Sequence, residues 1–140
     1  NVPSEKIDTT ELAGRVRVAF AEYEASSLAS GDVVQMFNLP NGARIVSGRL
    51  AHDALNSSTT LSVGYAAHTN AAGTAVSLSA AAYKAAGSSA SATAANVANT
   101  IALGENSIVD ANKDGLPVSV TLGGASADGT IQLTMMYVVD

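Results

Sequence analysis

The feature that most constrains the fold of this 140-residue chain is a hydrophobic period of two residues. Apolar side chains alternate with small or polar ones along several short segments, such as 59–65 and 130–139. This alternation is typical of a β-strand that has one face buried and the other exposed. Near the start of the chain it predicts a strand whose buried face carries Val16, Val18 and Phe20.

Turn-forming residues separate the alternating segments. Residues 40–42 read Pro-Asn-Gly, a strong turn signal because Pro presets φ and Asn-Gly tolerates positive φ. The two apolar runs on either side therefore predict a hairpin over residues 32–52. A Gly-rich stretch at 123–129 separates two further runs and predicts a second hairpin over residues 116–139.

The middle of the chain, residues 66–98, is rich in Ala, Ser, Thr and Asn and has few bulky apolar side chains. Residues 79–86 predict one short helix, because Ala has the highest helix propensity and Lys84 would lie in the last turn. Residues 88–95 are too small and polar to bury much area, so we expect a loop there. Two short strands are expected after it, at 99–103 and 106–110.

These segments together predict an all-β protein, an antiparallel β-sandwich of jelly-roll type with roughly eight or nine short strands. Residues 14–140 are expected to form this single domain. Residues 1–13 are polar and lack a hydrophobic period, so we expect an N-terminal arm that orders against a neighbour or, as the alternative, a simple frayed terminus. No apolar run approaches the roughly 20 residues that a membrane-spanning helix needs, and no membrane partner is expected.

Composition argues against several classes of function. The chain has no Cys, which removes disulfide frameworks, thiolate metal sites and cysteine nucleophiles. Its formal net charge of −5 argues against a nucleic-acid partner, because such partners attract clustered cations. Charged residues make up only 14% of the chain, against roughly 25% in an ordinary soluble domain.

One motif is a candidate metal site. Asp110, Asn112 and Asp114, followed by Gly115, match the first half of an EF-hand calcium loop. The twelfth position of that loop would be Thr121, which cannot supply a bidentate carboxylate. The alternative is a β-turn, where Asn, Asp and Gly serve for their backbone freedom. The sequence favours the turn, and no metal or other cofactor is expected.

The residues that could support catalysis are sparse. His68 and the adjacent pair His52-Asp53 include both imidazoles of the chain, but no serine lies in a nucleophile-elbow pattern. Glu22 and Glu24 are two residues apart and fit a solvated strand face or ion pairs with neighbouring arginines. Without a convergent acid–base set, we expect that the chain is not an enzyme.

Two of the predicted strands carry apolar residues on both faces. One face of each would fill the core, so the other is expected to be covered by another subunit. Abundant small side chains favour such contacts, since they lose little rotamer entropy on association. The candidate interface residues on these second faces are Val33, Phe37, Met136 and Val138.

The chain also resembles a known group of proteins. Residues 31–50, 53–64 and 120–138 are similar to small virion structural proteins of tailed bacteriophages, including marine and cyanobacterial phages. The resemblance covers residues 14–65 and 116–139 and is a pattern of runs and turns rather than a catalytic motif.

The resemblance implies a decoration, or cement, protein on the outer surface of the phage capsid. Such proteins are β-sandwiches or jelly rolls, often trimers, that bridge neighbouring subunits of the major capsid protein. The expected partners are therefore the major capsid protein and further copies of this chain. The alternatives are another virion component, such as a neck, tail or head-fibre base, or a carbohydrate-binding β-sandwich, which the absence of Trp disfavours.

Overall fold

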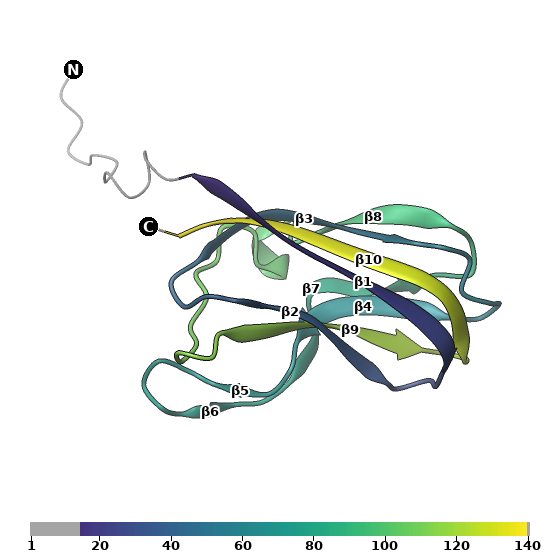
Figure 1. Cartoon of the computed structure of the whole chain (residues 1–140), viewed down its shortest axis with the longest axis horizontal. Helices are drawn as coiled ribbons and strands as arrows, with labels where there is room; N and C mark the ends of the chain where they lie inside the picture. The colour runs from purple at the N-terminus through teal and green to yellow at the C-terminus, as the bar shows by residue number, and fades with distance from the viewer. Residues whose placement is uncertain (1–14, 140) are drawn as a thin grey trace, which may run out of the picture.

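The computed structural model describes residues 15–139, which form two four-stranded antiparallel sheets packed face to face (Figure 1). The predicted arm, residues 1–13, lies outside the described residues. The first sheet contains, in order across it, β1 (Val16–Leu28), β10 (Ala127–Val138), β3 (Arg44–His52) and β8 (Thr93–Val97). The second contains β2 (Val33–Leu39), β9 (Leu116–Gly123), β4 (Thr60–Tyr65) and β7 (Ser79–Ser88).

Three short elements lie outside these sheets. Strands β5 (His68–Thr69) and β6 (Ala75–Val76) pair with each other within the connection from β4 to β7. A 3₁₀ turn, η1 (Ile101–Leu103), lies between β8 and β9. No helix among residues 15–139 is long and apolar enough to cross a membrane.

Apart from β5 and β6, the chain crosses from one sheet to the other at nearly every connection. The strands β1, β3, β8 and β10 belong to the first sheet, and β2, β4, β7 and β9 to the second. Eight strands in two sheets with this interleaved order form a jelly roll. The prediction of an all-β antiparallel sandwich of jelly-roll type is therefore confirmed.

Both predicted hairpins are wrong in their pairing. The strands on either side of the 40–42 turn, β2 and β3, lie in different sheets, and so do β9 and β10. Gly42 has a φ of +85°, so the turn exists, but it carries the chain across the sandwich. Turn residues indicate where a chain reverses and leave open whether its next strand pairs with the last or packs opposite to it.

The core lies between the two sheets and is built from alternate side chains of their central strands. Burying each such Leu, Ile, Val or Met contributes about 1.5–3 kcal/mol relative to leaving it exposed. The largest fully buried side chains include Leu39, Ile45, Leu50, Leu61, Leu122, Ile131, Leu133 and Met135.

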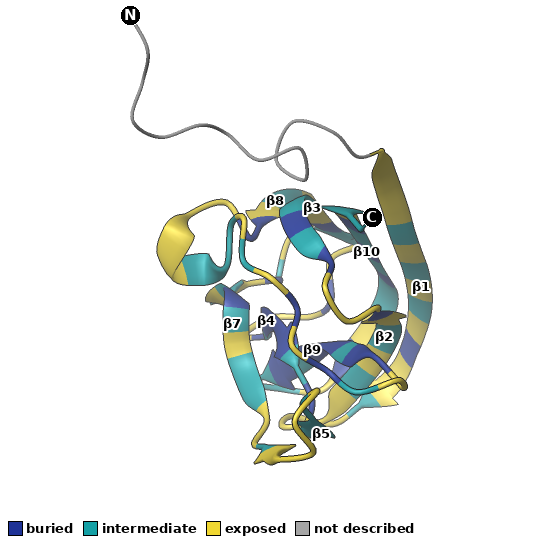
Figure 2. Cartoon of the chain, turned by 90° about the vertical axis from the view of Figure 1, so that its left-hand side faces the viewer, coloured by how far each residue is buried: buried dark blue, intermediate teal, exposed yellow. Residues whose placement is uncertain are grey.

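Strand β1 presents the opposite face from the one predicted. Val16, Val18 and Phe20 are exposed, whereas Ala19 packs against the core and Ala25 is buried. Figure 2 shows the resulting bands of exposed and less exposed residues along β1. The strand continues beyond Phe20, and its outward face then carries Glu22 and Glu24. Burying two unpaired carboxylates would cost far more than exposing three apolar side chains, and this fixes the orientation.

The helix predicted over residues 79–86 is wrong, because this segment is strand β7. Its only large apolar side chain is Tyr83, so a helix there would have no apolar stripe to bury. As a strand it pairs with β4 and inserts Tyr83 into the core, where the ring contacts Tyr65 edge-on. Burial raises the pKa of Tyr83 well above its usual value, and the neighbouring Tyr65 adds to the shift.

Other local predictions also change. Residues 93–95 of the expected loop belong to β8, which completes the first sheet by pairing with β3. Residues 101–103, expected in a strand, form η1, and the 106–110 segment makes only one isolated bridge, from Ile108 to Arg44. Few side chains of these short segments reach the core, since Ile101 and Ile108 are exposed, so their conformation depends on the neighbouring backbone.

Candidate interaction surface

The most prominent functional feature is an apolar ridge on the outer face of the first sheet. Val16, Val18 and Phe20 occupy alternate positions on β1 and are 57%, 60% and 56% exposed. We call these three residues the β1 ridge. Strand β1 is an edge strand, so no further strand formed by residues 15–139 lies beside the ridge on its outer side.

Strand β10 extends this apolar surface across the sheet. In the β1–β10 register, Met136 lies opposite Val18 and Val138 lies opposite Val16. The ridge and these two side chains form the apolar patch, in which Met136 is 38% exposed. Contiguous exposed apolar patches on monomeric proteins are often interaction sites. Two of the four predicted interface residues, Met136 and Val138, therefore lie on one continuous surface.

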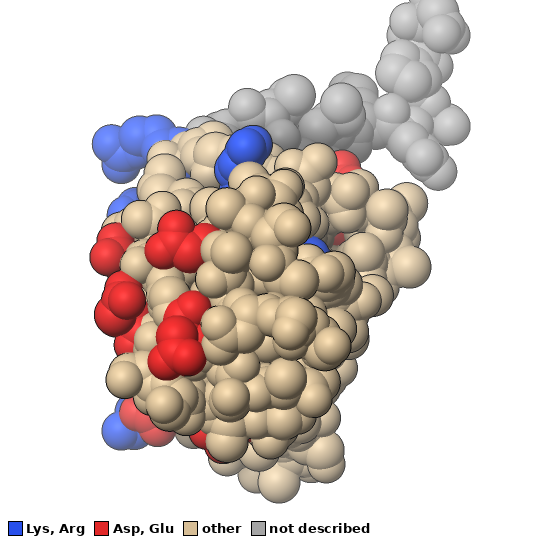
Figure 3. All heavy atoms as spheres, turned by 90° about the vertical axis from the view of Figure 1, so that its right-hand side faces the viewer, with Lys and Arg blue, Asp and Glu red and all other residues tan. Residues whose placement is uncertain are grey.

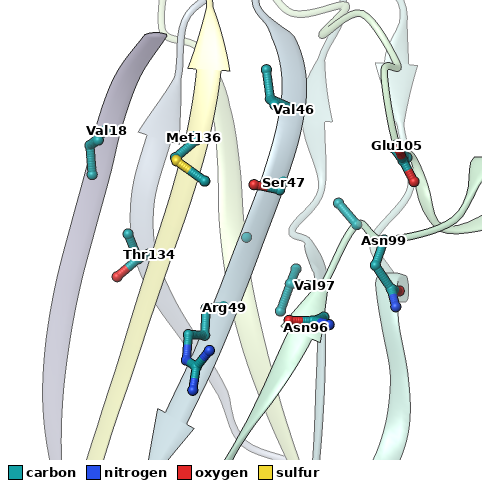
Figure 4. Close-up of a pocket in the computed structure, with 12 residues that line it drawn as sticks. Val18, Val46, Ser47, Arg49, Asn96, Val97, Asn99, Glu105, Thr134 and Met136 are labelled. Atoms are coloured by element: carbon teal, nitrogen blue, oxygen red, sulfur yellow. The ribbon is translucent and has the colours of Figure 1, made fainter.

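A groove of about 600 Å³ lies beside the ridge on the same sheet face (Figure 4). Val18 and Met136 form one side of it, and the segment after β8, including Asn99 and Glu105, forms the other. Ser47 and Arg49 from β3 lie between the two sides. Arg49 is exposed, and no carboxylate among residues 15–139 pairs with it.

The other two predicted interface residues lie on the second sheet. Val33 is 40% exposed, but Phe37 is partly buried and packs against the core. A bulge in β2 between Gln35 and Phe37 breaks the strict alternation, which places Phe37 opposite the buried Val118 of β9. Whether Val33, Met136 or Val138 contacts another chain stays a prediction.

A second exposed apolar region lies at η1. Ile101 is 90% exposed, in a turn that begins at Thr100, whose hydroxyl accepts a hydrogen bond from Leu103 N–H. The turn ends at Gly104 in the left-handed conformation. Ile108, which is also exposed, lines the same pocket as Ile101. Residues 15–139 therefore present exposed apolar side chains at η1 as well as on the first sheet.

Carboxylates gather at the end of the sandwich where β1 turns into β2 and β9 into β10 (Figure 3). Most of them hold loops or strands: Glu22 accepts a hydrogen bond from Gln132, and Asp53 accepts one from Thr130 N–H. Asp128 accepts hydrogen bonds from backbone and side-chain donors, chiefly Ser27 N–H, and these lower its pKa below the usual value. Their first role is therefore structural.

The candidate metal ligands also serve a loop. Asp110 Oδ1 accepts a hydrogen bond from Ala71 N–H at 3.1 Å, and Asn112 Oδ1 accepts one from Asp114 N–H at 2.9 Å. Gly115 N–H donates to the carbonyl of Asn112 and closes a turn. Within residues 15–139, no group of three or more His, Cys, Asp or Glu side chains is arranged to hold a metal ion.

The two histidines are not brought together. His52 ends β3, with Nδ1 2.8 Å from the carbonyl oxygen of Asp53. His68 lies on β5, where its Nδ1 is 2.9 Å from the carbonyl oxygen of Ala66 and its ring packs edge-on against Tyr65. Strand β5 lies at the other end of the molecule from the connection that follows His52 (Figure 1). The pair therefore offers no shared site.

Sequence reasoning missed the β1 ridge. The alternation of Val16, Val18 and Phe20 was interpreted as a buried face, although it is the most exposed apolar part of the sheet. The signal that could have found it is the continuation of the same alternation to Glu22 and Glu24. A strand face that begins apolar and ends acidic is an outer face.

No protein-family model matches the chain, and no curated protein matches it in sequence. Solved structures do match. A chain of the cyanophage Pam1 capsid asymmetric unit is 19% identical, with a TM-score of 0.66, over 100% of this chain and 94% of that one. A chain of the Ralstonia phage GP4 capsid is 21% identical, with a TM-score of 0.67, over 100% and 90%.

A chain of the acid-stable capsid of Helicobacter pylori bacteriophage KHP30 is 17% identical, with a TM-score of 0.59. The match covers 91% of this chain and 90% of that one. At these identities the likeness shows a shared fold. The class that fold and surface define is a small jelly-roll protein with an exposed apolar sheet face, of the same architecture as chains found in phage capsid structures.

Proposed function

We propose that this chain is a structural protein of a virus particle, and specifically a decoration protein on the outside of a bacteriophage capsid. In this role it binds the lattice of the major capsid protein, bridges neighbouring subunits and stabilises the shell. The resemblance in sequence further favours a trimer as the bound form.

The observation that carries this proposal is the end-to-end match to chains of three phage capsid structures. This chain covers 90% or more of each matched chain, so all three are of about its own length. The match is therefore to whole small capsid components, as expected for a chain added to a shell.

The surface chemistry supports the same role. Bridging requires at least two contact regions, and the chain offers the apolar patch on the first sheet and the exposed Ile101 region at η1. A chain that touches several subunits gains effective concentration with each added contact. Because such binding occurs only on the assembled lattice, it stabilises that lattice by mass action.

The test is binding of the purified chain to capsids of its own bacteriophage that have been prepared without their decoration protein. We expect co-sedimentation with expanded capsids, little with immature ones, and a rise in the temperature at which capsids release DNA. A cryo-electron reconstruction should then show added density at regular positions of the outer lattice. Density only at the neck, tail or fibre base would assign the chain to that component instead.

A further inference from the structure

We infer that the outer face of the first sheet binds a second copy of this chain, with the β1 ridge of each copy seated in the groove of the other. The ridge and the groove lie side by side on one face, and Val18 and Met136 belong to the borders of both. A surface that carries a projection beside a matching depression is complementary to itself under two-fold rotation.

The strand register fixes which residues would meet. Phe20, Thr134 and Arg49 lie in one row across β1, β10 and β3, and Val18, Met136 and Ser47 lie in another. Consider a two-fold axis that is parallel to β10 and lies in the plane of the interface. Rotation about it places β1 of one copy over β3 of the other, with residues of the same row facing each other. Phe20 then faces Arg49 and Val18 faces Ser47 of the second copy.

These pairings are chemically favourable. A guanidinium over an aromatic ring is attracted by the negative face of the ring, more strongly when both are removed from water. Ser47 is small, so it allows the close approach of a branched side chain such as Val18. Each pairing occurs twice in a two-fold complex.

Charge complementarity also favours a second copy. Arg49 has no ion-pair partner among residues 15–139. In the row next to Phe20, Glu22 lies opposite Gln132, which is paired with Ala51 of β3. The same rotation therefore places Glu22 of one copy over Ala51 of the other, in the row next to that of Arg49. Arg49 gains a carboxylate that its own chain does not provide.

The surface that this pairing would bury is largely apolar. Val16, Val18 and Phe20 are each more than half exposed and Met136 is 38% exposed, so the contact removes apolar surface from water on both copies. The pairing uses the same apolar patch that the proposed capsid role offers for contact, so in the dimer this patch contacts a second copy and the exposed Ile101 region stays free for the lattice. It also differs from a trimer, which needs three-fold contacts.

The experiment measures the mass of the full chain in solution by sedimentation equilibrium over a range of concentrations. We expect a reversible dimer of twice the 14.0 kDa chain mass. Phe20→Asp should raise the dimer dissociation constant about 30-fold or more, as for loss of an interface hot spot. Leu78→Asp, which adds a charge at an exposed apolar position between β6 and β7, is the matched control and should leave the constant unchanged.

A charge swap tests the pairing itself. Arg49→Glu and Glu22→Arg should each weaken the dimer about tenfold, and the double variant should recover most of the loss, as a coupled pair does. Thermal unfolding of each variant must match that of the parent chain. A monomer at every concentration, a trimer, or a dimer that Leu78→Asp weakens as much as Phe20→Asp does would overturn the inference.

Discussion

At the scale of single residues, a tight constraint lies in the loop between β9 and β10. Gly124 has a φ of +86°, and a Cβ at this position would lie 1.9 Å from the carbonyl oxygen of Ser58. The left-handed conformation alone costs an L-residue about 1–2 kcal/mol, and the clash adds to it. We therefore expect Gly124→Ala to lower the free energy of unfolding by about 3 kcal/mol or more, measured by urea denaturation.

Gly73 provides the matched control. It has the same φ of +86°, but a Cβ there would meet no atom within 4 Å. Gly73→Ala should therefore cost only the conformational term, about 1–2 kcal/mol. Equal losses for the two variants would contradict the claim that the approach of Ser58, rather than the backbone angle, makes Gly124 necessary.

The same scale shows how far the sequence predicts the surface. Met136 and Val138 were identified because they lie opposite a clearly apolar face of the last strand. Phe37 packs partly against the core because of a bulge in β2, which is a feature of strand pairing and leaves no mark in a two-residue period; its contact with another chain stays a prediction. The ridge around Val18 was missed because a short window cannot decide which of two faces is buried.

At the scale of elements, β7 shows what holds an Ala-rich edge strand in a sheet. Tyr83 is its only large buried side chain, and its ring contacts Tyr65 at a centroid distance of 6.1 Å. We expect Tyr83→Ala to lower the free energy of unfolding by about 3–5 kcal/mol, as for other buried aromatic side chains.

Tyr83→Phe isolates the contribution of the ring. It keeps the packing and removes only the hydroxyl, so the loss should stay within about 1.5 kcal/mol. Hydrogen exchange should show faster opening of β7 amides in Tyr83→Ala than in Tyr83→Phe. If both variants lost the same stability, the hydroxyl rather than the packed ring would be the anchor.

The predicted helix at 79–86 failed at this same scale. Helix propensity contributes less than 1 kcal/mol per residue. The free edge of β4 offers instead a row of backbone hydrogen-bond partners for β7, with room for the ring of Tyr83. The hairpins failed for a related reason. Strong turn signals gave the positions of the reversals, but in a sandwich the partner of a strand is often far away in sequence.

At the scale of the whole molecule, the all-β class followed from the sequence because alternation and turns recur along most of its length. The order of the strands within each sheet could not be predicted, since it depends on which strand faces pack against each other in the folded sandwich. The candidate surface combines residues of β1, β3, β8 and β10, which only the folded sheet brings side by side. When a sequence has no catalytic motif, its fold class is therefore easier to predict than its interaction surface.

The interleaved order predicts that the fold is complete only when the last strand is present. Strand β10 lies between β1 and β3, and its Ile131, Leu133 and Met135 are fully buried. A chain that ends at Ser126 leaves β1 and β3 without their common partner and opens the core. We expect no cooperative thermal transition and the circular dichroism of an unfolded chain.

The local pair β5–β6 should behave in the opposite way. Tyr65 and Ser79 are register partners on either side of it, so a short Gly/Ser loop can join β4 to β7 in place of residues 67–77. This deletion removes about as many residues as β10 contains, but it takes no strand from either four-stranded sheet. A cooperative thermal transition should therefore remain. A truncated chain that unfolds cooperatively, or a loop deletion that does not, would mean that stability follows chain length rather than the central position of β10.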